Sequence, residues 1–336
     1  MEFCGAEITS RFFLAPLAGY TDAGFRALAA ENGAAVTYTE MVSAKGMCYG
    51  SPGTDALLYT TATESNVAVQ LFGSEPEFMR RAAADARIGK FTFVDINMGC
   101  PVKKIFSNGD GSALMKDPAL IEDVVRATAE GARKPVTVKI RAGITEGETL
   151  AVKCAEAAVR GGAAAVAVHP RYREQMYGGI ADHGITAAVK EAVGVPVVAS
   201  GDITDAESFI RIKRESKADF FMIGRGALGR PWIFRALAEL DEAATACGDA
   251  FALENAERFF VLAKSRFDAL DAAKRHLATL LEVLPPRAAA NSMKLHLCKY
   301  AVGTPNAKRV REEVVSATTP DDIIAVAEKY LGCSDR

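Results

Sequence analysis

The chain has 336 residues and a net charge of −2 at pH 7, with 49% of its residues hydrophobic and 24% charged. This composition is typical of a globular protein with a sizeable core, and the length allows one large domain and a smaller one. Because the net charge is nearly balanced, it gives no indication that the chain binds nucleic acid. A surface that binds nucleic acid would have to be a local cluster of basic residues.

Seven cysteines are scattered singly, with no Cys-x-x-Cys pair. Because metal-site spacing is missing, we predict no bound metal, and the odd count indicates reduced thiols. Residues 1–10 lack the basic start and apolar run of a signal peptide, and no apolar stretch is long enough to span a membrane. We therefore expect a cytoplasmic protein, a monomer, with no membrane partner.

Short apolar runs alternate with helical patterns along the first two thirds of the chain. Their β-branched and aromatic residues are typical of strands, and the segments between them have helical spacing. The runs lie at 12–15, 36–40, 67–71, 93–98, 136–141, 165–169, 197–200 and 220–223. Eight such units predict an α/β fold, a parallel (β/α)8 TIM barrel, with an open doubly wound sheet as the alternative.

Polar residues at the ends of these runs favour the barrel. They are Gln70, Asn97, Lys139, His169, Asp202 and Arg225. In a barrel the carboxyl ends of all strands converge on one face, where active sites are built, whereas an open sheet would separate the first from the last.

The fourth run leads into a turn that displays a cysteine. Gly99 allows a sharp turn and Pro101 prevents the strand from continuing, so Cys100 lies at the mouth of the barrel beside Asn97. A thiol in this place can donate a proton or act as a nucleophile. The alternative is that Cys100 is a small buried hydrophobic residue.

Glycine-rich turns follow the last two runs. Ser200-Gly201-Asp202 and Gly224-Arg225-Gly226 each lead into a helix, where backbone N–H groups and the helix dipole favour a phosphate. The alternative is that these glycines only make tight turns, but Arg225 favours the phosphate. Lys139 lies at the end of its strand, so its ammonium group could stabilise negative charge on an electron-rich ring bound at the barrel mouth.

The sixth run ends in a loop with three potential cations. His169 is followed at alternate positions by Arg171 and Arg173, which suggests a phosphate or an acidic substrate. An isolated histidine is otherwise more often packed in a core, and Gln70 could simply satisfy local backbone groups.

Together these motifs closely resemble those of the tRNA-dihydrouridine synthases, flavoenzymes that reduce uridines in transfer RNA. The resemblance covers the whole barrel and rests on Ala15-Pro16-Leu17-Ala18-Gly19 with Thr21-Asp22, Gln70, Asp95-Ile96-Asn97-Met98-Gly99-Cys100-Pro101, Gly111-Ser112, Lys139-Ile140-Arg141, His169 with Arg171 and Arg173, Gly201-Asp202 and Gly224-Arg225. Leu17 and Ser200 stand where methionine and asparagine are common in the family.

The resemblance implies an FMN cofactor at the barrel mouth and NAD(P)H as the electron donor. The residues expected to bind FMN are Pro16, Leu17, Ala18, Gln70, Lys139, His169, Ser200, Gly201, Asp202, Gly224 and Arg225. Cys100 would be the catalytic proton donor. The residues expected to bind the substrate are Asn97, Arg141, Arg171, Arg173, Lys294 and His296.

The implied chemistry agrees with these residue types. Reduced flavin gives hydride to C6 of uracil, and a thiol of ordinary pKa, about 8.5, is protonated at neutral pH yet acidic enough to protonate C5. The uracil must leave its stack to reach the ring, so we expect the substrate to be an extruded base in folded RNA.

Past Trp232 strand patterns stop and helical patterns cover 256–282, 288–302 and 321–331. We predict a barrel over 1–240 and a helical tRNA-binding domain over 241–336. Eleven lysines and arginines against three acids between Arg258 and Arg311 suggest a phosphate-binding surface, with a solvated helix face as the alternative. In the family's RNA-binding motif, Lys294 and His296 match, whereas Leu295 and Lys299 depart.

Two other functions compete with this one. The first is an FMN barrel oxidoreductase that acts on a free pyrimidine-like metabolite, and the basic helical domain argues against it. The second is a non-enzymatic RNA-binding protein on a barrel scaffold, and Cys100, Lys139 and His169 argue against it.

Overall fold

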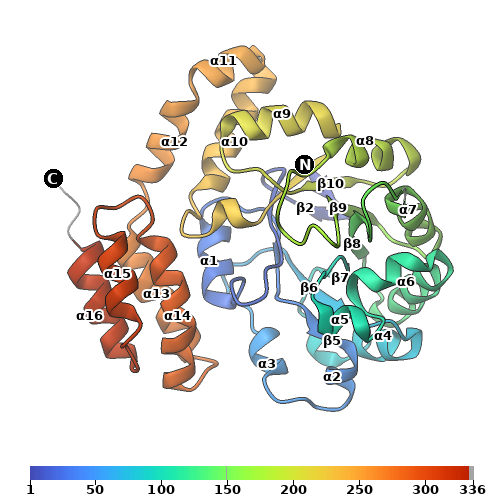
Figure 1. The fold of residues 1–336 in the computed structure, drawn as a ribbon, viewed down its shortest axis with the longest axis horizontal. Coiled ribbons are helices and arrows are strands. Elements are labelled where there is room, and N and C mark those ends of the chain that lie inside the picture. The colour runs from blue at the N-terminus through green and yellow to red at the C-terminus, as the bar shows by residue number, and fades with distance from the viewer. Residues whose placement is uncertain (149, 333–336) are drawn as a thin grey trace.

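Eight parallel strands close into a barrel in the computed structural model, which describes residues 1–148 and 150–332 (Figure 1). The strands are β3 (Phe12–Leu14), β4 (Thr37–Tyr38), β6 (Val67–Phe72), β7 (Phe93–Met98), β8 (Val136–Gly143), β9 (Ala165–Tyr172), β10 (Val197–Ser200) and β11 (Phe220–Ile223). Their order is β3-β11-β10-β9-β8-β7-β6-β4, and a parallel bridge from Phe13 to Val36 joins the two ends. The predicted TIM barrel is therefore confirmed. A further short strand, β5 (Val42–Ser43), also pairs with β6.

Helices cover the outside of the barrel because both faces of its strands must be buried. The long ones are α1 (Ala23–Glu31), α4 (Pro76–Ala83), α6 (Pro118–Ala132), α7 (Leu150–Arg160), α8 (His183–Ala192), α9 (Ala206–Ser216) and α10 (Ile233–Cys247). Shorter ones are α2 (Ala44–Cys48), α3 (Thr54–Leu57), α5 (Lys103–Ser107) and the 3-10 turns η1 (Ala86–Ile88), η2 (Gly111–Lys116) and η3 (Arg225–Ala227). Aspartates cap several of them: Asp22, Asp117 and Asp205 accept first-turn N–H groups of α1, α6 and α9.

An N-terminal hairpin that the sequence patterns did not reveal packs its aromatic residue against the barrel interior. Strands β1 (Glu2–Phe3) and β2 (Ala6–Glu7) pair antiparallel. Phe3 is 1% exposed, and its ring meets those of Phe13, Phe93 and Phe220 edge-on at 4.9, 5.3 and 5.0 Å. Aromatic burial from the first residues of the chain therefore contributes to the barrel core.

The C-terminal region is helical, as predicted, but its division differs. It contains α11 (Asp249–Glu254), α12 (Ala256–Ser265), α13 (Ala269–Leu281), α14 (Pro286–Tyr300), α15 (Ala307–Val314) and α16 (Pro320–Leu331). The helix predicted over 256–282 is two helices, because Asp268 caps a new start by accepting the N–H groups of Leu270 and Asp271. Helix α15 was not predicted. None of the helices that the structure describes is both long and apolar enough to cross a membrane.

Two hydrophobic cores show where the helical region separates from the barrel. Residues of α10 and α11, including Leu240 and Ala252, belong to the same cluster as Phe12 and Phe221 of the barrel. Helices α13 to α16 share a second cluster, to which α1 contributes Leu28. The expected boundary after residue 240 thus falls inside α10, and we call α13 to α16 the helical bundle (Figure 1).

Replacing Phe3 by alanine tests the contribution of the hairpin. We expect Phe3→Ala to lower the free energy of unfolding by about 3–5 kcal/mol, because a fully buried aromatic ring is removed and a cavity remains. Urea unfolding followed by circular dichroism measures it. Tyr49→Ala is the matched control, since that ring is 74% exposed and its removal should cost less than about 0.5 kcal/mol. Equal effects of the two variants would contradict the packing role of Phe3.

Candidate active site

Hydrogen bonds on both sides fix the turn after β7, which carries Cys100. The Oδ1 atom of Asn97 accepts hydrogen bonds from the N–H groups of Gly99 at 3.1 Å and Cys100 at 2.8 Å. The carbonyl of Cys100 accepts the hydroxyl of Ser112 at 2.8 Å. Gly111 adopts φ +61°, and a Cβ there would lie 3.0 Å from the Cys100 Cβ, so only glycine fits comfortably. The backbone of Cys100 is thereby held at one position.

The Cys100 thiol is only 9% exposed. Burial raises the pKa of this thiol, although the N–H of Val102 and the positive charge of Arg141 act in the opposite direction. Cys100 is therefore protonated at neutral pH, as a proton donor must be.

Arg141, which we expect to bind substrate, is buried and bonded to backbone carbonyls. It is 2% exposed, and its guanidinium donates to the carbonyls of Gly99 at 2.6 Å, Tyr172 at 3.2 Å and Met176 at 2.8 Å. A buried guanidinium needs such acceptors to offset its lost hydration. Arg141 thus ties the cysteine turn to the loop after β9.

A chain of hydrogen bonds crosses the barrel interior below this turn. Gln70 Nε2 donates to Asp95 Oδ2 at 2.7 Å, and Thr137 Oγ1 donates to Asp95 Oδ1 at 2.6 Å. The amide of Asn97 donates to Gln70 Oε1 at 2.8 Å. Burial raises the pKa of Asp95 to about 6, while the bonds from Thr137 and Gln70 and the charge of Lys139 oppose the rise. Gln70 and Asn97 are therefore oriented by Asp95, a role that the sequence did not reveal.

Lys139 of β8 lies beside this chain of hydrogen bonds. Its neighbour across the strands is Asn97, with which it is in register between β7 and β8. Burial lowers the pKa of Lys139 to about 8, helped by the charge of Arg141 and opposed by Asp95. Among the residues that the structure describes, the Lys139 ammonium has no hydrogen-bond partner. It is thus free to meet a negative or electron-rich group.

The loops after β9 and β10 are joined by a second buried arginine. Arg171 is 2% exposed and donates to both carboxylate oxygens of Asp202 at 2.8 Å, while its Nη1 lies 3.2 Å from His169 Nε2. Burial would raise the pKa of Asp202, but the N–H of Ala181 and the Arg171 guanidinium lower it overall. Arg171, which we expect to bind substrate, also holds the turn after β10 through Asp202.

His169 is neutral in this setting, because burial and the cations Lys139 and Arg141 hold its pKa well below the usual range. Its ring lies against the turn after β10: a Cβ at Gly201, where φ is +116°, would come within 2.9 Å of His169 Cδ2. Ser200 beside it is buried.

Arg225 is the accessible cation of this group, with its side chain 53% exposed and its guanidinium 3.0 Å from the carbonyl of Tyr177. The turn at Gly224 faces the loop after β3, since a Cβ there would lie 3.7 Å from Leu17 Cδ2. Pro16 is half-buried and Ala18 is exposed on that loop. The structure therefore brings the residues expected to bind FMN to one end of the barrel.

The other residues expected to bind the substrate, Arg173, Lys294 and His296, lie in three different environments. The Arg173 guanidinium lies 3.9 Å over the ring of Phe106, at the rim. Lys294 of α14 is half-buried and donates to the carbonyl of Val315 at 3.0 Å. His296 is 1% exposed and faces Asp22 of the barrel, so its environment differs from the exposed RNA contact that we expected.

A protonated thiol and a free ammonium at the carboxyl ends of barrel strands define a TIM-barrel enzyme with an anion-binding mouth. Solved structures share this fold: a histamine dehydrogenase from Rhizobium sp. 4-9 aligns with a TM-score of 0.52 at 14% identity, over 83% of this chain and 50% of that one. An amine oxidase from Pseudomonas geniculata N1 aligns at 0.54 and 12% identity, over 74% and 49%. The chain thus spans about half of these two proteins.

A family model described as dihydrouridine synthase (Dus) matches residues 13–331, and the chain belongs to that family. It is 38% identical over 235 residues to a tRNA-dihydrouridine synthase B of Shewanella oneidensis, covering 70% of this chain and 73% of that one. It is 34% identical over 331 residues to a protein of the same name from Xanthomonas axonopodis pv. citri, covering 98% and 96%. The family predicted from the sequence is confirmed, and its enzymes are flavin-dependent oxidoreductases.

Alkylation tests the protonation state of Cys100. At neutral pH we expect iodoacetamide to modify Cys100 at least about tenfold more slowly than Cys247, because the thiolate is the reacting form and burial raises the pKa of Cys100. Cys247 is the internal control because it is exposed. Mass spectrometry of the peptides follows both rates, and the Cys100 rate should increase with pH as the thiol is deprotonated. Fast modification of Cys100 near neutral pH would show a thiolate, which could not donate the proton.

Proposed function

We propose that this protein reduces the C5–C6 double bond of uridines in transfer RNA to dihydrouridine, with FMN as cofactor and NAD(P)H as reductant. The observation that supports the proposal is the protonated Cys100 thiol in the turn after β7. The Lys139 ammonium lies on the neighbouring strand β8, opposite Asn97. Membership in the dihydrouridine synthase family supports it. A tRNA substrate would also place the protein in the cytoplasm, as we predicted from its cysteines.

The mouth fits FMN on two counts. The Lys139 ammonium lacks a protein partner among the described residues, and a reduced, anionic isoalloxazine ring would supply one. The turns at Gly201 and Gly224 lie beside the exposed Arg225 guanidinium, which suits the phosphate. Leu17 would border the ring, because its side chain packs toward Gly224.

Proton delivery is the chemistry that this chain's own residues would perform. When bound, reduced FMN would supply a hydride to C6 of the uracil. Cys100 would then give its Sγ proton to C5 from the opposite face, and Asn97 would hold the turn that aims this thiol. The buried Asp95, through Gln70, would keep the Asn97 amide in the orientation that the turn requires.

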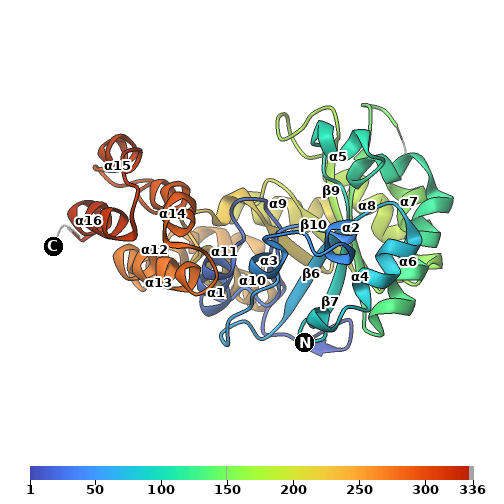
Figure 2. The same ribbon diagram turned by 90° about the horizontal axis from the view of Figure 1, so that it is seen from below.

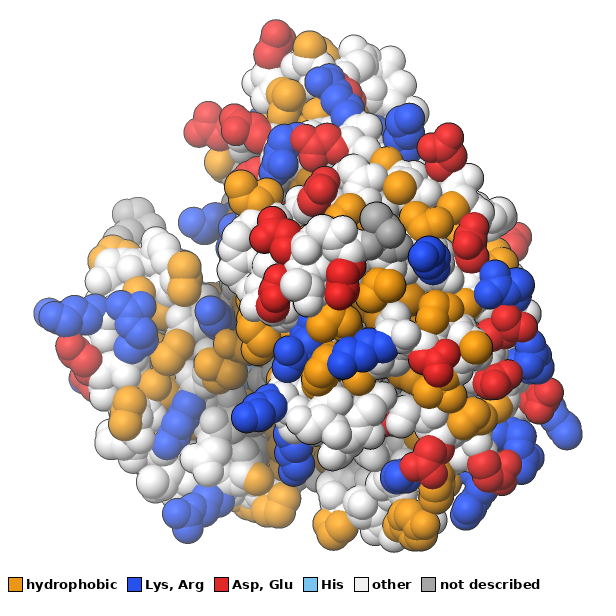
Figure 3. Space-filling model, turned by 45° about the vertical axis from the view of Figure 1, so that its right-hand side comes forward, with side chains coloured by type: hydrophobic (Ala, Val, Ile, Leu, Met, Phe, Trp, Pro, Cys, Tyr) orange, Lys and Arg blue, Asp and Glu red, His pale blue; other side chains and the backbone are white. Residues whose placement is uncertain are grey.

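The helical bundle offers the surface for transfer RNA. Exposed basic side chains lie on α14 and α15 at Arg287, Lys308, Arg309 and Arg311. In Figure 2 these helices lie on the same side of the molecule as α5 and the loop after β9, which border the barrel mouth. Figure 3 shows lysine and arginine side chains spread over the bundle at the left, whereas the barrel surface at the right mixes both charges. An RNA that binds the bundle could therefore reach the mouth.

Replacing Cys100 by alanine tests the proton donor. We expect Cys100→Ala to keep its flavin and its reduction by NADPH, while dihydrouridine formation falls by about 10²–10⁴, the usual contribution of a positioned general acid. Single-turnover oxidation of prereduced enzyme by transfer RNA measures this step. Cys154→Ala is the control, since that thiol is buried in α7, away from the mouth. Equal rates for wild type and Cys100→Ala would leave Cys100 as a packing residue.

Charge removal tests the RNA surface. We expect the double variant Arg309→Gln/Arg311→Gln to bind transfer RNA more weakly, with a salt slope reduced by about 1 for each phosphate that the variant no longer neutralises. Lys153→Gln is the control, because this exposed lysine lies on α7, across the barrel from the bundle (Figure 1). Filter binding over a range of salt concentrations measures both. A wild-type affinity that does not depend on salt would instead favour a free pyrimidine-like substrate.

A further inference from the structure

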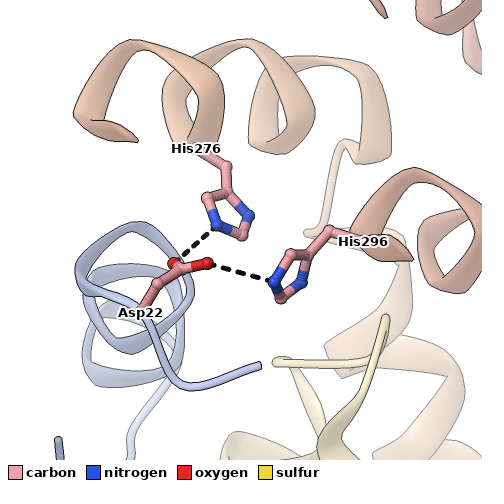
Figure 4. Close-up of side chains that lie close together, drawn as sticks. All are labelled: Asp22, His276 and His296. Carbon is pink, nitrogen blue, oxygen red and sulfur yellow. Dashed lines mark hydrogen bonds and ion pairs between the residues drawn. The ribbon is translucent and has the colours of Figure 1, made fainter. Parts of the chain in front are cut away.

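Three side chains from the barrel and the helical bundle meet at the start of α1 (Figure 4). Asp22 precedes α1, whereas His276 comes from α13 and His296 from α14. Asp22 Oδ1 lies 2.7 Å from His276 Nε2, and Asp22 Oδ2 lies 3.1 Å from His296 Nε2. Both rings are at most 1% exposed. Tyr300 completes the group, with its hydroxyl 2.8 Å from His276 Nδ1.

The protonation of this group follows from its geometry. Burial alone would raise the pKa of the Asp22 carboxyl, but the two histidines bring it well below the usual range, so Asp22 is a carboxylate. Burial and the neighbouring His276 lower the pKa of His296, and Asp22 opposes them. Since a carboxylate only accepts, His276 directs its Nε2–H toward Asp22 Oδ1, and Tyr300 can then donate to His276 Nδ1. His296 Nε2 and Asp22 Oδ2 face each other at ion-pair distance, and neither atom has a hydrogen-bond partner among the described residues. The 2.7 Å distance between His276 Nε2 and Asp22 Oδ1 is that of a charge-assisted hydrogen bond.

The same aspartate is joined to the loop after β3. Asp22 Oδ1 also accepts the N–H of Phe25 at 3.0 Å and so caps α1. Its neighbour Thr21 closes the loop, because Leu17 N donates to Thr21 Oγ1 at 3.0 Å and Thr21 N donates to the carbonyl of Leu17 at 3.0 Å. Tyr20 of this loop meets His296 edge-on at 5.9 Å. Residues 17–21 are therefore one hydrogen-bonded unit that ends at Asp22.

Two glycines let the bundle approach this closely. A Cβ at Gly24 would lie 2.2 Å from His276 Cδ2, and a Cβ at Gly229, where φ is +75°, would lie 2.1 Å from the carbonyl oxygen of Lys299. Neither position has room for a side chain. The bundle therefore packs closely against the barrel where His276 and His296 lie next to Asp22.

We propose that Asp22 is a positioning residue that couples docking of the helical bundle to the shape of the loop at residues 16–21. This inference rests on the proposed function, in which that loop borders FMN and the bundle holds transfer RNA. When both histidines hold the carboxylate, the closed loop keeps Leu17 against the turn at Gly224. The domain that binds RNA thereby sets the geometry of the domain that performs the chemistry.

The variant Asp22→Asn separates this role from helix capping, because asparagine is also a good N-cap but lacks the negative charge and the second carboxylate oxygen that face the two histidines. We expect amide hydrogen exchange at residues 17–21 to become about tenfold faster in the flavin-loaded enzyme. We also expect single-turnover reduction of transfer RNA to slow by about 10–100-fold, since small misplacements of reacting groups have such effects. The affinity for transfer RNA should change less than about threefold, and the flavin absorption band should shift.

Matched variants make the test specific. His296→Leu should behave as Asp22→Asn does, whereas His296→Gln, which keeps an N–H donor, should restore most of the rate and the protection. Glu31→Gln breaks the ion pair of Glu31 with Arg275 at the same interface, away from the loop, and should change neither. If Glu31→Gln matches Asp22→Asn, or if exchange at residues 17–21 is unchanged in Asp22→Asn, the proposal is overturned.

Two further measurements keep the inference apart from the proposed function. Faster exchange in Asp22→Asn, with a wild type that holds no flavin or never reduces transfer RNA, would support the coupling and refute the proposed function. Metal analysis of the purified wild type gives the second measurement. One equivalent of tightly bound zinc that is absent from His296→Leu would show that the three side chains ligate a metal, and would overturn the hydrogen-bonded coupling.

Discussion

Buried arginines hold the loops at the mouth of the barrel, and the candidate site depends on them. Arg26, Arg141 and Arg171 are the largest fully buried side chains of the described chain. Arg26 pairs with the buried Glu64 at 2.8 Å and donates to the carbonyl of Thr21 at 2.9 Å. Because a buried guanidinium without acceptors is costly, each arginine fixes the backbone groups that surround it. The loops after β3, β7 and β10 are thereby held in place by three buried cations.

The sequence predicted the strands well because parallel strands between helices are apolar on both faces and polar where they end. Gln70, Asn97 and Lys139 lie on the neighbouring strands β6, β7 and β8. The roles of Arg141 and Arg171 could not be predicted, because carbonyl acceptors such as Gly99 O leave no sequence signal. The family resemblance predicts that both arginines bind the substrate, and the structure adds that both are buried and hold the backbone around the mouth.

Long-range packing explains the other differences. The expected boundary after residue 240 failed to separate two cores because α10 directs Leu240 into the barrel cluster rather than toward the bundle. The contact between Asp22 and His276 joins residues 254 positions apart, so residue spacing carries no sign of it. Asp95, the acid that orients Gln70, looked like part of an apolar strand, although a carboxylate in such a run is itself a signal of a buried polar network.

The mouth also has to keep Cys100 protonated beside several cations, which would normally favour a thiolate. Burial has the larger effect on the pKa of Cys100, and Arg141 opposes it. Arg141 directs its N–H groups at carbonyls, including that of Gly99 at 2.6 Å, rather than at the sulfur. Lys139, by contrast, is left without a partner among the described residues, and it sits on the neighbouring strand. The Lys139 ammonium is thus available to the proposed flavin ring, while the Cys100 thiol keeps the proton that it would deliver.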